Sequence, residues 1–408
     1  MRFKQNIITL KMPKKFDFLL QLAVLILIAF GTLMIVSTNV GNTSQDSLIL
    51  VKVIVKQTIF VVVSYFLMTF FANHFSMRKA QKLLPYMAVL MIGALLSTQL
   101  FEGVLGSQAW IRIALPGGFE FTIQPSEFAK VFMVIVMAVY IEVAGKRNLE
   151  FWNIVKMPLL FFAGCAGAIL LQKDLGTLIV LSALCAICFL IPSHTNIRKQ
   201  QHLIAILFLV GASLLLFVMS EPGLKFIEKI PFIGHVGVRI ENAVNPFEDP
   251  HGNGYQLING LYGFAKSGIT GVGLGNSIQK YGYLTQSDND FILSIVVEEL
   301  GIFGLGIVVI GYFVIIQRLF YYAFRTKSEG YKIILIGTAM YIFIHFVLNV
   351  GGVSGLIPLT GVPLLFISSG GSSLMAVMSA IGISQAVIAR IRRQGSVDKN
   401  IKKSPKGV

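Results

Sequence analysis

Apolar runs of nearly membrane-spanning length occupy most of this chain, and they constrain its fold more than any other feature. A helix needs about 20 predominantly apolar residues to cross the hydrocarbon core of a bilayer. Runs that approach this length occur at residues 17–38, 50–73, 83–101, 127–145, 157–172, 175–192, 203–219, 291–318, 331–350 and 372–389. The mean hydropathy of +0.76 agrees with this pattern. We therefore expect an all-α polytopic membrane protein with about ten transmembrane helices.

The distribution of lysine and arginine predicts how these helices are oriented. Short cytoplasmic loops carry an excess of both residues. Both chain ends are basic, as are alternate loops near residues 78–82, 146–147, 198–199 and 325–332, whereas the loops at 39–49 and 351–371 contain no Lys or Arg. We therefore expect both termini to be cytoplasmic, with basic ends at 1–16 and 391–408. This bias accounts for most of the net charge of +15, so we expect no nucleic-acid partner.

The same topology places a long extracytoplasmic loop at residues 220–290, between the seventh and eighth spans. Loops of this length within a compact fold are usually functional. The 252–275 half is semi-apolar and rich in glycine, which predicts an amphipathic or re-entrant segment.

Two motifs suggest other functions only superficially. The run Gly271-Val272-Gly273-Leu274-Gly275-Asn276 lacks the spacing of a nucleotide-binding loop. Cys185 and Cys188 lie in an apolar run with no second pair, which favours buried packing over a metal site.

Polar residues gather in three short patches that the topology places on one side. These patches are residues 124–130, 276–299 and 361–373. Ionisable residues in membrane spans are costly, and they normally face a protein interior or a wet cavity. We therefore expect the function to lie where the three patches meet.

The second patch is acidic. Asp288 and Asp290 precede the eighth apolar run, and Glu298 and Glu299 lie within it. Asp290 fits two interpretations, an N-cap for a helix that begins at Phe291 or a reactive carboxylate. Glu298 or Glu299 has a structural alternative as well, which is a hydrogen bond between helices.

The first patch adds a cation on the same side, because Pro125 is expected to start a helix in which Lys130 follows within the first turns. An ion pair between Lys130 and Asp290 would lower the cost of burying either charge. Alternatively, Lys130 extends to the membrane interface. His345, inside the ninth run, fits either a polar tether between helices or a proton relay.

The third patch combines Pro, Gly and Ser residues in the run Ser368-Ser369-Gly370-Gly371-Ser372-Ser373 and just before it. Such a segment is a poor helix but a good polar backbone lining. Its amides would suit an oxyanion such as a pyrophosphate. An ordinary connection into the tenth span would have a similar composition.

Together, these patches and several other short motifs resemble the SEDS (shape, elongation, division and sporulation) family of bacterial cell-wall polymerases, which includes FtsW and RodA. The motifs are Trp110-Ile111, Gln124-Pro125-Ser126-Glu127-Phe128-Ala129-Lys130, Asp174-Leu175-Gly176-Thr177, Asn245-Pro246-Phe247, Gly254-Tyr255-Gln256, Gly273-Leu274-Gly275-Asn276-Ser277, Asp290-Phe291, Glu298-Glu299-Leu300-Gly301 and Ser368-Ser369-Gly370-Gly371-Ser372-Ser373. The resemblance covers essentially the whole chain, with one transmembrane domain at 17–390. It is closer to the division-type FtsW branch than to the elongation-type RodA branch.

The resemblance implies an inverting peptidoglycan glycosyltransferase that polymerises lipid II at the outer face of the bacterial cytoplasmic membrane. The implied partners are a class B penicillin-binding protein and other division proteins. Asp290 and Lys130 are the expected catalytic residues. The expected substrate-binding residues are Trp110, Gln124, Ser126, Glu127, Asn276, Ser368, Gly370, Gly371 and Ser372. The expected supporting residues are Asp288, Glu298, Glu299 and Asp174.

Several alternatives stay open. A lipid II flippase would also need many spans, although the chain shows no repeated half-pattern. An elongation-type polymerase and a non-catalytic division scaffold are others. No metal ligand cluster or cofactor motif is established, although a divalent cation would assist a departing pyrophosphate.

Two departures from the family pattern stand out. The chain has Thr285-Gln286-Ser287-Asp288-Asn289-Asp290 where Pro-Glu-Ala-His-Thr-Asp is common, and Gln172-Lys173-Asp174 where Gln-Pro-Asp is usual. The first departure leaves Asp288 as a partial substitute for the missing side chains. The second is expected to loosen the turn before Asp174.

Overall fold

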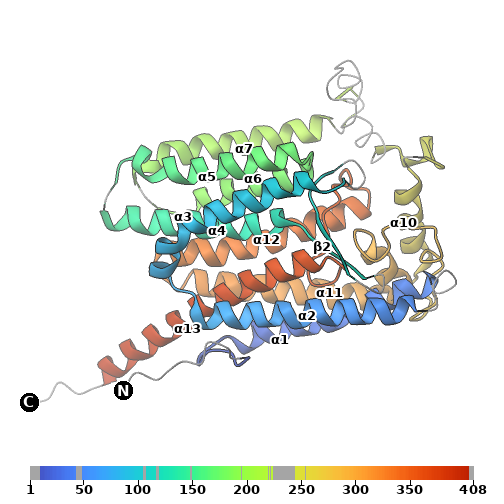
Figure 1. The fold of residues 1–408 in the computed structure, drawn as a ribbon, viewed down its shortest axis with the longest axis horizontal. Helices are drawn as coiled ribbons and strands as arrows, with labels where there is room; N and C mark the ends of the chain where they lie inside the picture. The colour runs from blue at the N-terminus through green and yellow to red at the C-terminus, as the bar shows by residue number, and fades with distance from the viewer. Residues whose placement is uncertain are drawn as a thin grey trace, which may run out of the picture.

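The computed structural model is a bundle of long helices, most of whose axes are nearly parallel or antiparallel (Figure 1). It describes residues 10–42, 48–103, 107–115, 119–147, 149–193, 195–218, 220, 222–223, 244–252 and 254–403. Arg2, Lys4, Lys406 and most of the 220–243 segment lie outside the described residues. The elements are α1 (Phe18–Asn39), α2 (Ile49–His74), α3 (Met77–Ser97), β1 (Ile111–Leu115), β2 (Phe119–Ile123), α4 (Pro125–Arg147), α5 (Phe151–Leu171), α6 (Leu175–Leu190), α7 (Arg198–Val218), α10 (Tyr255–Lys266), α11 (Ile292–Ala323), α12 (Glu329–Val353) and α13 (Gly371–Lys403).

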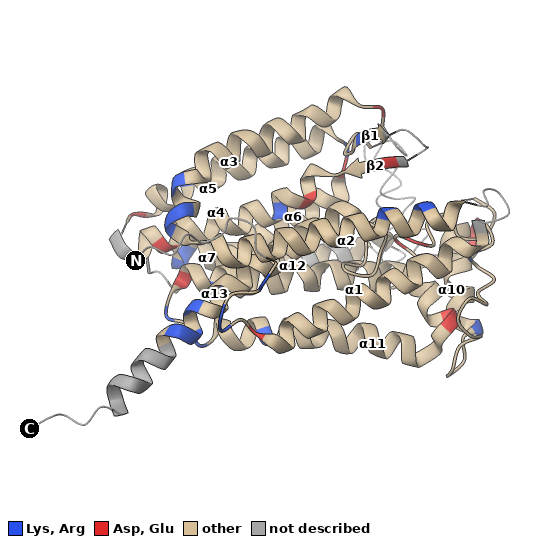
Figure 2. Cartoon of the chain, turned by 60° about the horizontal axis from the view of Figure 1, so that its bottom comes forward, with Lys and Arg blue, Asp and Glu red and all other residues tan. Residues whose placement is uncertain are grey.

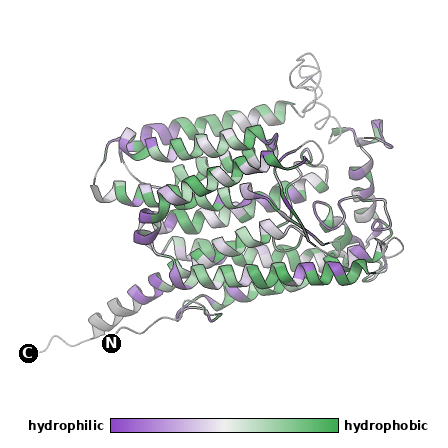
Figure 3. Ribbon diagram, in the orientation of Figure 1, coloured by the Kyte–Doolittle hydropathy of each residue, from purple (hydrophilic) through white to green (hydrophobic). Residues whose placement is uncertain are grey.

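Apolar composition makes most of these helices candidates for membrane spans. Among the described residues, nine helices are long and apolar enough to cross a membrane. The helix α6 is apolar but shorter, with 16 residues. Figure 3 shows hydrophobic residues along the bundle and hydrophilic residues mainly toward its two ends. The expected polytopic helical fold is confirmed, whereas the count of ten spans stays a prediction.

The helix α13 lies at the centre of the bundle. In its most apolar window 89% of the residues are buried, compared with 17% for α2. It packs against α2, α4 and α12, and α11 packs against α1 and α12. Small residues allow close contact, since a Cβ on Gly382 would lie 2.2 Å from the Met68 carbonyl oxygen. The α2 stripe that faces this contact repeats every three or four residues, at Gln57, Phe60, Ser64, Met68 and Ala72.

Side chains cap several helices where the sequence supplies them. Asp17, Ser76, Asp174 and Ser328 accept a hydrogen bond from the backbone of the first turn of α1, α3, α6 and α12, respectively. Such caps satisfy amides that the helix itself leaves unpaired. The helix α4 begins at Pro125, as predicted. Cys185 and Cys188 are free cysteines packed within α6, which supports the packing interpretation.

A β-hairpin occupies the connection between α3 and α4, and the sequence analysis missed it. The strands β1 and β2 pair antiparallel, with Ile111 opposite Ile123. The signal was present, because Ile111, Ile113 and Leu115 alternate with other residues, and Pro116-Gly117-Gly118 follows them. We expected only a loop there, because the segment is too short and too polar for a membrane-spanning helix.

Both described ends of the chain lie at the same end of the bundle. The Arg392 guanidinium donates to the Phe16 carbonyl, and that of Arg390 donates to the Phe75 carbonyl between α2 and α3. Figure 2 shows a band of Lys and Arg at this end. The opposite end carries the hairpin and α10 (Figure 1). The helix α10 falls in the segment predicted to be amphipathic, and it buries Leu257 and Ile258 while Tyr262 is exposed.

Candidate active site

The three polar patches meet at the end of the bundle that carries the hairpin (Figure 1). The turn before α11 is bonded to the turn before α13, because the Ser369 amide donates to the Asp288 carbonyl over 2.9 Å. The Gln124 amide at the start of α4 donates to Ser372 Oγ over 2.9 Å. Segments that are far apart in the sequence therefore form one polar site, as we expected.

Asp290 lies in the turn before α11 and carries a carboxylate that is not fully paired. Its Oδ1 is buried without a hydrogen-bond partner, and a Cβ on Gly361 would lie 3.7 Å from its Oδ2. Burial, with a smaller contribution from nearby Asp288, raises the pKa of Asp290 to about 6. The N-cap interpretation is wrong, since Phe291 occupies the cap position of α11 and no side chain caps that helix. This carboxylate can therefore accept a proton from a ligand.

Lys130 pairs with Glu127 and not with Asp290. Its Nζ lies 2.7 Å from Glu127 Oε1 and 2.9 Å from His345 Nε2. Glu127 Oε2 accepts a further hydrogen bond from the Tyr341 hydroxyl over 2.9 Å. Lys130 is 1% exposed, so the prediction that it extends to the interface is wrong.

The expected ion pair between Lys130 and Asp290 is likewise absent from the described contacts. Glu127 precedes Lys130 by three residues, so both side chains lie on the same face of α4. This spacing allows Glu127 to neutralise the buried lysine without any long-range contact.

His345 connects this ion pair to the third patch. Its Nδ1 lies 3.2 Å from the Pro363 carbonyl oxygen, which can only accept. Nδ1 therefore carries the ring proton, and Nε2 accepts from Lys130. This geometry supports the tether interpretation of His345, because the ring binds α4 at one nitrogen and the 361–363 segment at the other.

Glu298 and Glu299 are 0% exposed and fully engaged with neighbouring groups. The Ser277 hydroxyl donates to Glu298 Oε2 over 2.5 Å, and Lys280 Nζ lies 3.0 Å from Glu299 Oε1. The Ser37 hydroxyl of α1 donates to Glu299 Oε2 over 2.7 Å, which confirms a hydrogen bond between helices for that residue. The two glutamates therefore hold the loop before α11 against the bundle.

Asp174 caps α6 and contacts the first patch. Its carboxylate accepts from the Thr177 amide over 3.0 Å and from Gln124 Nε2 over 3.1 Å. Lys173 has a φ of 58°, which proline cannot adopt because its ring fixes φ near −65°. The lysine at this position therefore changes the backbone path of the turn, while Asp174 keeps its contacts.

The remaining candidates differ in how much room they leave for a ligand. Trp110 is half-buried directly before β1, and Asn276 is exposed in the loop that the glutamates hold. Ser126 is 0% exposed, and its Oγ has no hydrogen-bond partner. Their binding roles stay predictions.

In the third patch, neighbouring groups already occupy part of the space. The Ser368 hydroxyl donates to the Asn289 carbonyl over 2.7 Å. A Cβ on Gly371 would lie 2.3 Å from the Phe60 ring, and one on Gly370 would lie 2.5 Å from the Ser373 hydroxyl. A side chain at either glycine would require the Ser373 hydroxyl or the Phe60 ring to move, and the binding roles of Ser368, Gly370, Gly371 and Ser372 stay predictions.

A metal site is not evident from clustered ligands. Within the residues that the structure describes, no group of three or more His, Cys, Asp or Glu side chains could hold a metal ion. Asp288 and Asp290 would offer two carboxylates to a cation that a substrate brings with it.

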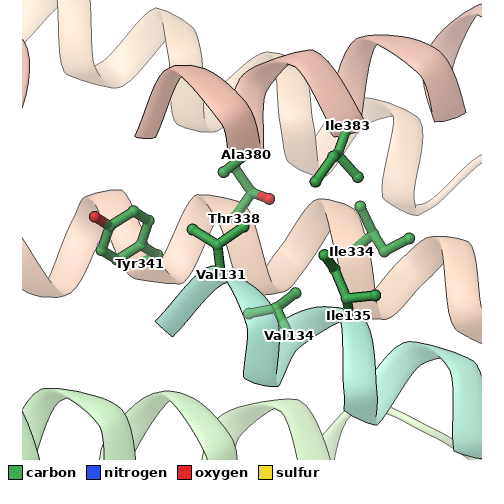
Figure 4. A pocket seen from close by; sticks show the side chains of 8 residues that line it. All are labelled: Val131, Val134, Ile135, Ile334, Thr338, Tyr341, Ala380 and Ile383. Carbon is green, nitrogen blue, oxygen red and sulfur yellow. The ribbon is translucent and has the colours of Figure 1, made fainter. Parts of the chain in front are cut away.

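A small apolar cavity lies deeper in the bundle, between α4, α12 and α13 (Figure 4). It is lined by Val131, Val134, Ile135, Ile334, Thr338, Tyr341, Ala380 and Ile383. Aliphatic side chains dominate its lining, and its two polar members already have partners, because Tyr341 donates to Glu127 and Thr338 accepts from Ser384. The polar end of the bundle is therefore the better candidate for chemistry.

Comparison with known proteins identifies the family. The family described as "Cell cycle protein", which groups FtsW, RodA and SpoVE, matches residues 17–394. This chain belongs to the FtsW, RodA and SpoVE family.

Relatives in this family align over nearly the whole chain. One is "Probable peptidoglycan glycosyltransferase FtsW" of Bacillus subtilis, 32% identical over 98% of this chain and 96% of the relative. Another is "Stage V sporulation protein E" of the same organism, 30% identical over 90% of this chain and 95% of the relative.

Solved structures share the fold of this family member. One is a chain from a structure described as "Structural coordination of polymerization and crosslinking by a peptidoglycan synthase complex", with a TM-score of 0.65, 23% identity, and coverage of 94% of this chain and 100% of that chain. Thermus thermophilus RodA has a TM-score of 0.57, 20% identity, and coverage of 92% and 97%. At these identities the likeness shows the fold.

Proposed function

We propose that this chain is a peptidoglycan glycosyltransferase that polymerises lipid II into glycan strands. Its membership of the FtsW, RodA and SpoVE family and the names of its FtsW relatives support this activity. The observation that carries the proposal is Asp290, a buried and incompletely paired carboxylate at the meeting point of three polar patches.

The chemistry requires a sugar hydroxyl to attack an anomeric carbon while a polyprenyl pyrophosphate departs. Asp290 would act as the general base that takes the hydroxyl proton, a contribution typically worth about 10²–10⁴-fold. A pKa of about 6 leaves this carboxylate mostly ionised at neutral pH yet basic enough to accept a proton. Because the leaving group stabilises its own charge, no strong general acid is needed, and a direct displacement inverts the anomeric centre.

Lys130 would serve this reaction indirectly. Its ammonium group is neutralised by Glu127 and does not contact Asp290 in the described structure. It instead holds His345, which in turn binds the Pro363 carbonyl next to the site. Lys130 would therefore support the backbone that faces Asp290, and, contrary to the expectation from the sequence, it would not contact the reacting groups.

The topology and the partners complete the proposal. The end that carries both described chain ends would be cytoplasmic, which follows from its band of Lys and Arg (Figure 2). The site and the 220–290 loop would then face outward, where lipid II is displayed. A class B penicillin-binding protein would supply crosslinking, and similarity to FtsW relatives favours a role in cell division together with other division proteins.

The experiment that tests this activity is polymer formation from purified lipid II. Wild type and Asp290→Asn are each reconstituted with a penicillin-binding partner whose transpeptidase is blocked. Glycan chains from wild type, and none from a folded Asp290→Asn variant that still binds the partner, would support the proposal. Equal polymer from both proteins would remove Asp290 from the mechanism.

Two further outcomes address the alternatives. A lack of polymer from wild type, together with transport of lipid II across vesicles, would favour a flippase. Polymer that depends only on the partner, with Asp290→Asn indistinguishable from wild type, would favour a scaffold. Rescue of cells depleted of FtsW, but not of cells depleted of RodA, would support the division role.

A further inference from the structure

Asn349, near the end of α12, joins Asp290 to the third patch. It is 3% exposed, and its Nδ2 donates to the Asp290 carbonyl over 2.8 Å and to the Val362 carbonyl over 3.0 Å. Carbonyl oxygens can only accept, so these contacts fix the orientation of the amide. Asn349 Oδ1 is consequently left buried without a hydrogen-bond partner, as is Asp290 Oδ1.

His345 lies one helical turn before Asn349 and is hydrogen-bonded to the next carbonyl of the same segment, that of Pro363. Residues four apart on a helix share one face, so both side chains point from α12 toward the 361–363 segment. His345 binds the Pro363 carbonyl while Asn349 binds the Val362 carbonyl. The two side chains therefore fix the position of two successive peptide units relative to α12.

The held segment is the one that faces the catalytic carboxylate. Gly361 has a φ of 68°, and a Cβ at this position would lie 3.7 Å from Asp290 Oδ2. A left-handed backbone favours glycine, and the missing side chain leaves space beside the carboxylate. Asn349 bonds both Asp290 and this backbone, and it therefore helps to fix the distance between them, together with the contacts of Ser368 and Ser369 to the same turn.

We propose that Asn349 and His345 are positioning residues that set the geometry of Asp290 for proton transfer. This inference rests on the proposed glycosyltransferase activity and adds two residues to it. The Lys130–Glu127 pair is also connected to the site, because Lys130 binds His345, which binds the Pro363 carbonyl.

Loss of the Asn349 amide would have two consequences. The carbonyls of Asp290 and Val362 would lose a shared donor, and a misplacement of about 1 Å at a reacting group can cost about 100-fold in rate. A carboxylate released from its buried position would also regain water, which lowers its pKa. Asp288 is the ionisable group that acts on Asp290, and the 361–363 segment, to which His345 is bonded, has no ionisable side chain.

The test measures kcat, KM and the pH dependence of kcat for lipid II polymerisation by the full chain with its transpeptidase-blocked partner. The variants are Asn349→Leu, which has a similar size and no amide, and Asn349→Ser, which is smaller and more readily tolerated. His345→Leu is compared with His345→Gln, whose amide still offers one donor and one acceptor. Thr338→Val is the matched control, because it removes a buried hydrogen bond to Ser384 from the same helix, three turns away.

We expect kcat of Asn349→Leu to fall by about tenfold to 100-fold with little change in KM, and its acidic pH limb to move downward. If that variant does not fold, Asn349→Ser should show both effects in smaller measure. His345→Gln should keep more activity than His345→Leu, and Thr338→Val should match wild type. An active wild type and an inactive Asp290→Asn, together with unchanged kcat and pH limb in either folded Asn349 variant, would overturn the inference and leave the proposed function standing.

Discussion

Each end of the bundle contains a buried aspartate, and the two aspartates differ in how fully their carboxylates are hydrogen-bonded. At the end with the chain termini, Asp17 accepts from Arg318 Nε over 3.1 Å and from the Tyr322 hydroxyl over 2.7 Å, and its backbone is bonded twice to the Gln385 side chain. At the opposite end, Asp290 Oδ1 has no partner. Asp17 links Arg318 of α11 to Gln385 of α13, whereas near Asp290 the turns that precede the same two helices are bonded to each other through Ser369 and Asp288.

The pKa values of the two carboxyl groups follow this difference. Burial raises the pKa of Asp17, but hydrogen bonds from Arg318, the Leu20 amide and Tyr322 outweigh that effect, so its pKa lies below the ordinary value. Burial and Asp288 raise the pKa of Asp290 to about 6. A fully bonded carboxylate stabilises the fold, whereas one with a vacant acceptor keeps its capacity for a ligand or a proton. The comparison therefore separates a structural end from a reactive end.

The largest expected effects come from removing each charge in turn. Asp290→Asn should lower the polymerisation rate by about 10²–10⁴-fold without lowering the melting temperature, because it removes a base and a costly buried charge. Asp17→Asn should lower the free energy of unfolding by about 3 kcal/mol, because it leaves Arg318 without its counter-ion, while the rate per folded molecule stays near wild type. Thermal unfolding in detergent measures the stability of each variant, and the initial rate of lipid II polymerisation measures its activity. A loss of stability in Asp290→Asn equal to that of Asp17→Asn would break the comparison.

The next effect is an opposite dependence of stability on pH. The pKa of Asp17 is lower when folded than when unfolded, so its stabilisation is present above about pH 4 and is lost as pH falls through the folded pKa. The pKa of Asp290 is higher when folded, so its contribution is full below about pH 4 and is lost as pH rises through about 6. Melting temperatures across this range should therefore show Asp290→Asn gaining on wild type as pH rises. Asp17→Asn should approach wild type as pH falls below about 4, and parallel curves for both variants would contradict the assignment.

Much of the fold follows from local sequence signals. The apolar runs predict the long helices, because each run must satisfy its backbone internally in a membrane. Pro125 predicted the start of α4, and the alternating Ile111, Ile113 and Leu115 before Pro116-Gly117-Gly118 contained the signal for the hairpin. These features depend on neighbours along the chain, which a sequence displays directly.

The site is less predictable, because its contacts join residues that are far apart in the sequence. The Glu127 and Lys130 pair was readable from a spacing of three residues, yet the prediction paired Lys130 with Asp290 because both were placed near one membrane face. Asn349 carried no signal at all, since a neutral amide inside an apolar run resembles any polar residue in a span. Its role depends on carbonyls 59 and 13 residues away.

A smaller expected effect concerns the influence of Asp288 on Asp290. Asp288→Asn removes the negative charge that contributes to the raised pKa of Asp290. The acidic limb of the polymerisation rate should therefore move from about pH 6 toward lower pH, with little change in the rate at neutral pH. Burial is the larger cause of the raised pKa, so the shift should be only partial. A pH profile identical to that of wild type would show that burial alone raises this pKa.

The smallest effect asks whether backbone strain also separates the two ends. Lys15 lies near Asp17 with a φ of 70°, and Lys173 lies near the site with a φ of 58°. Both lysines are exposed, and a left-handed conformation costs a residue with a side chain about 1–2 kcal/mol. Glycine avoids this cost but loses more backbone entropy on folding, so the net gain is smaller.

Lys15→Gly and Lys173→Gly should each raise the free energy of unfolding by about 0.5–1 kcal/mol, with no change in the polymerisation rate. Equal gains would show that strain is shared by both ends, so that the vacant acceptor at Asp290 remains the feature that distinguishes the reactive end. A gain confined to Lys173→Gly and accompanied by lower activity would instead make strain in the turn before Asp174 part of the site.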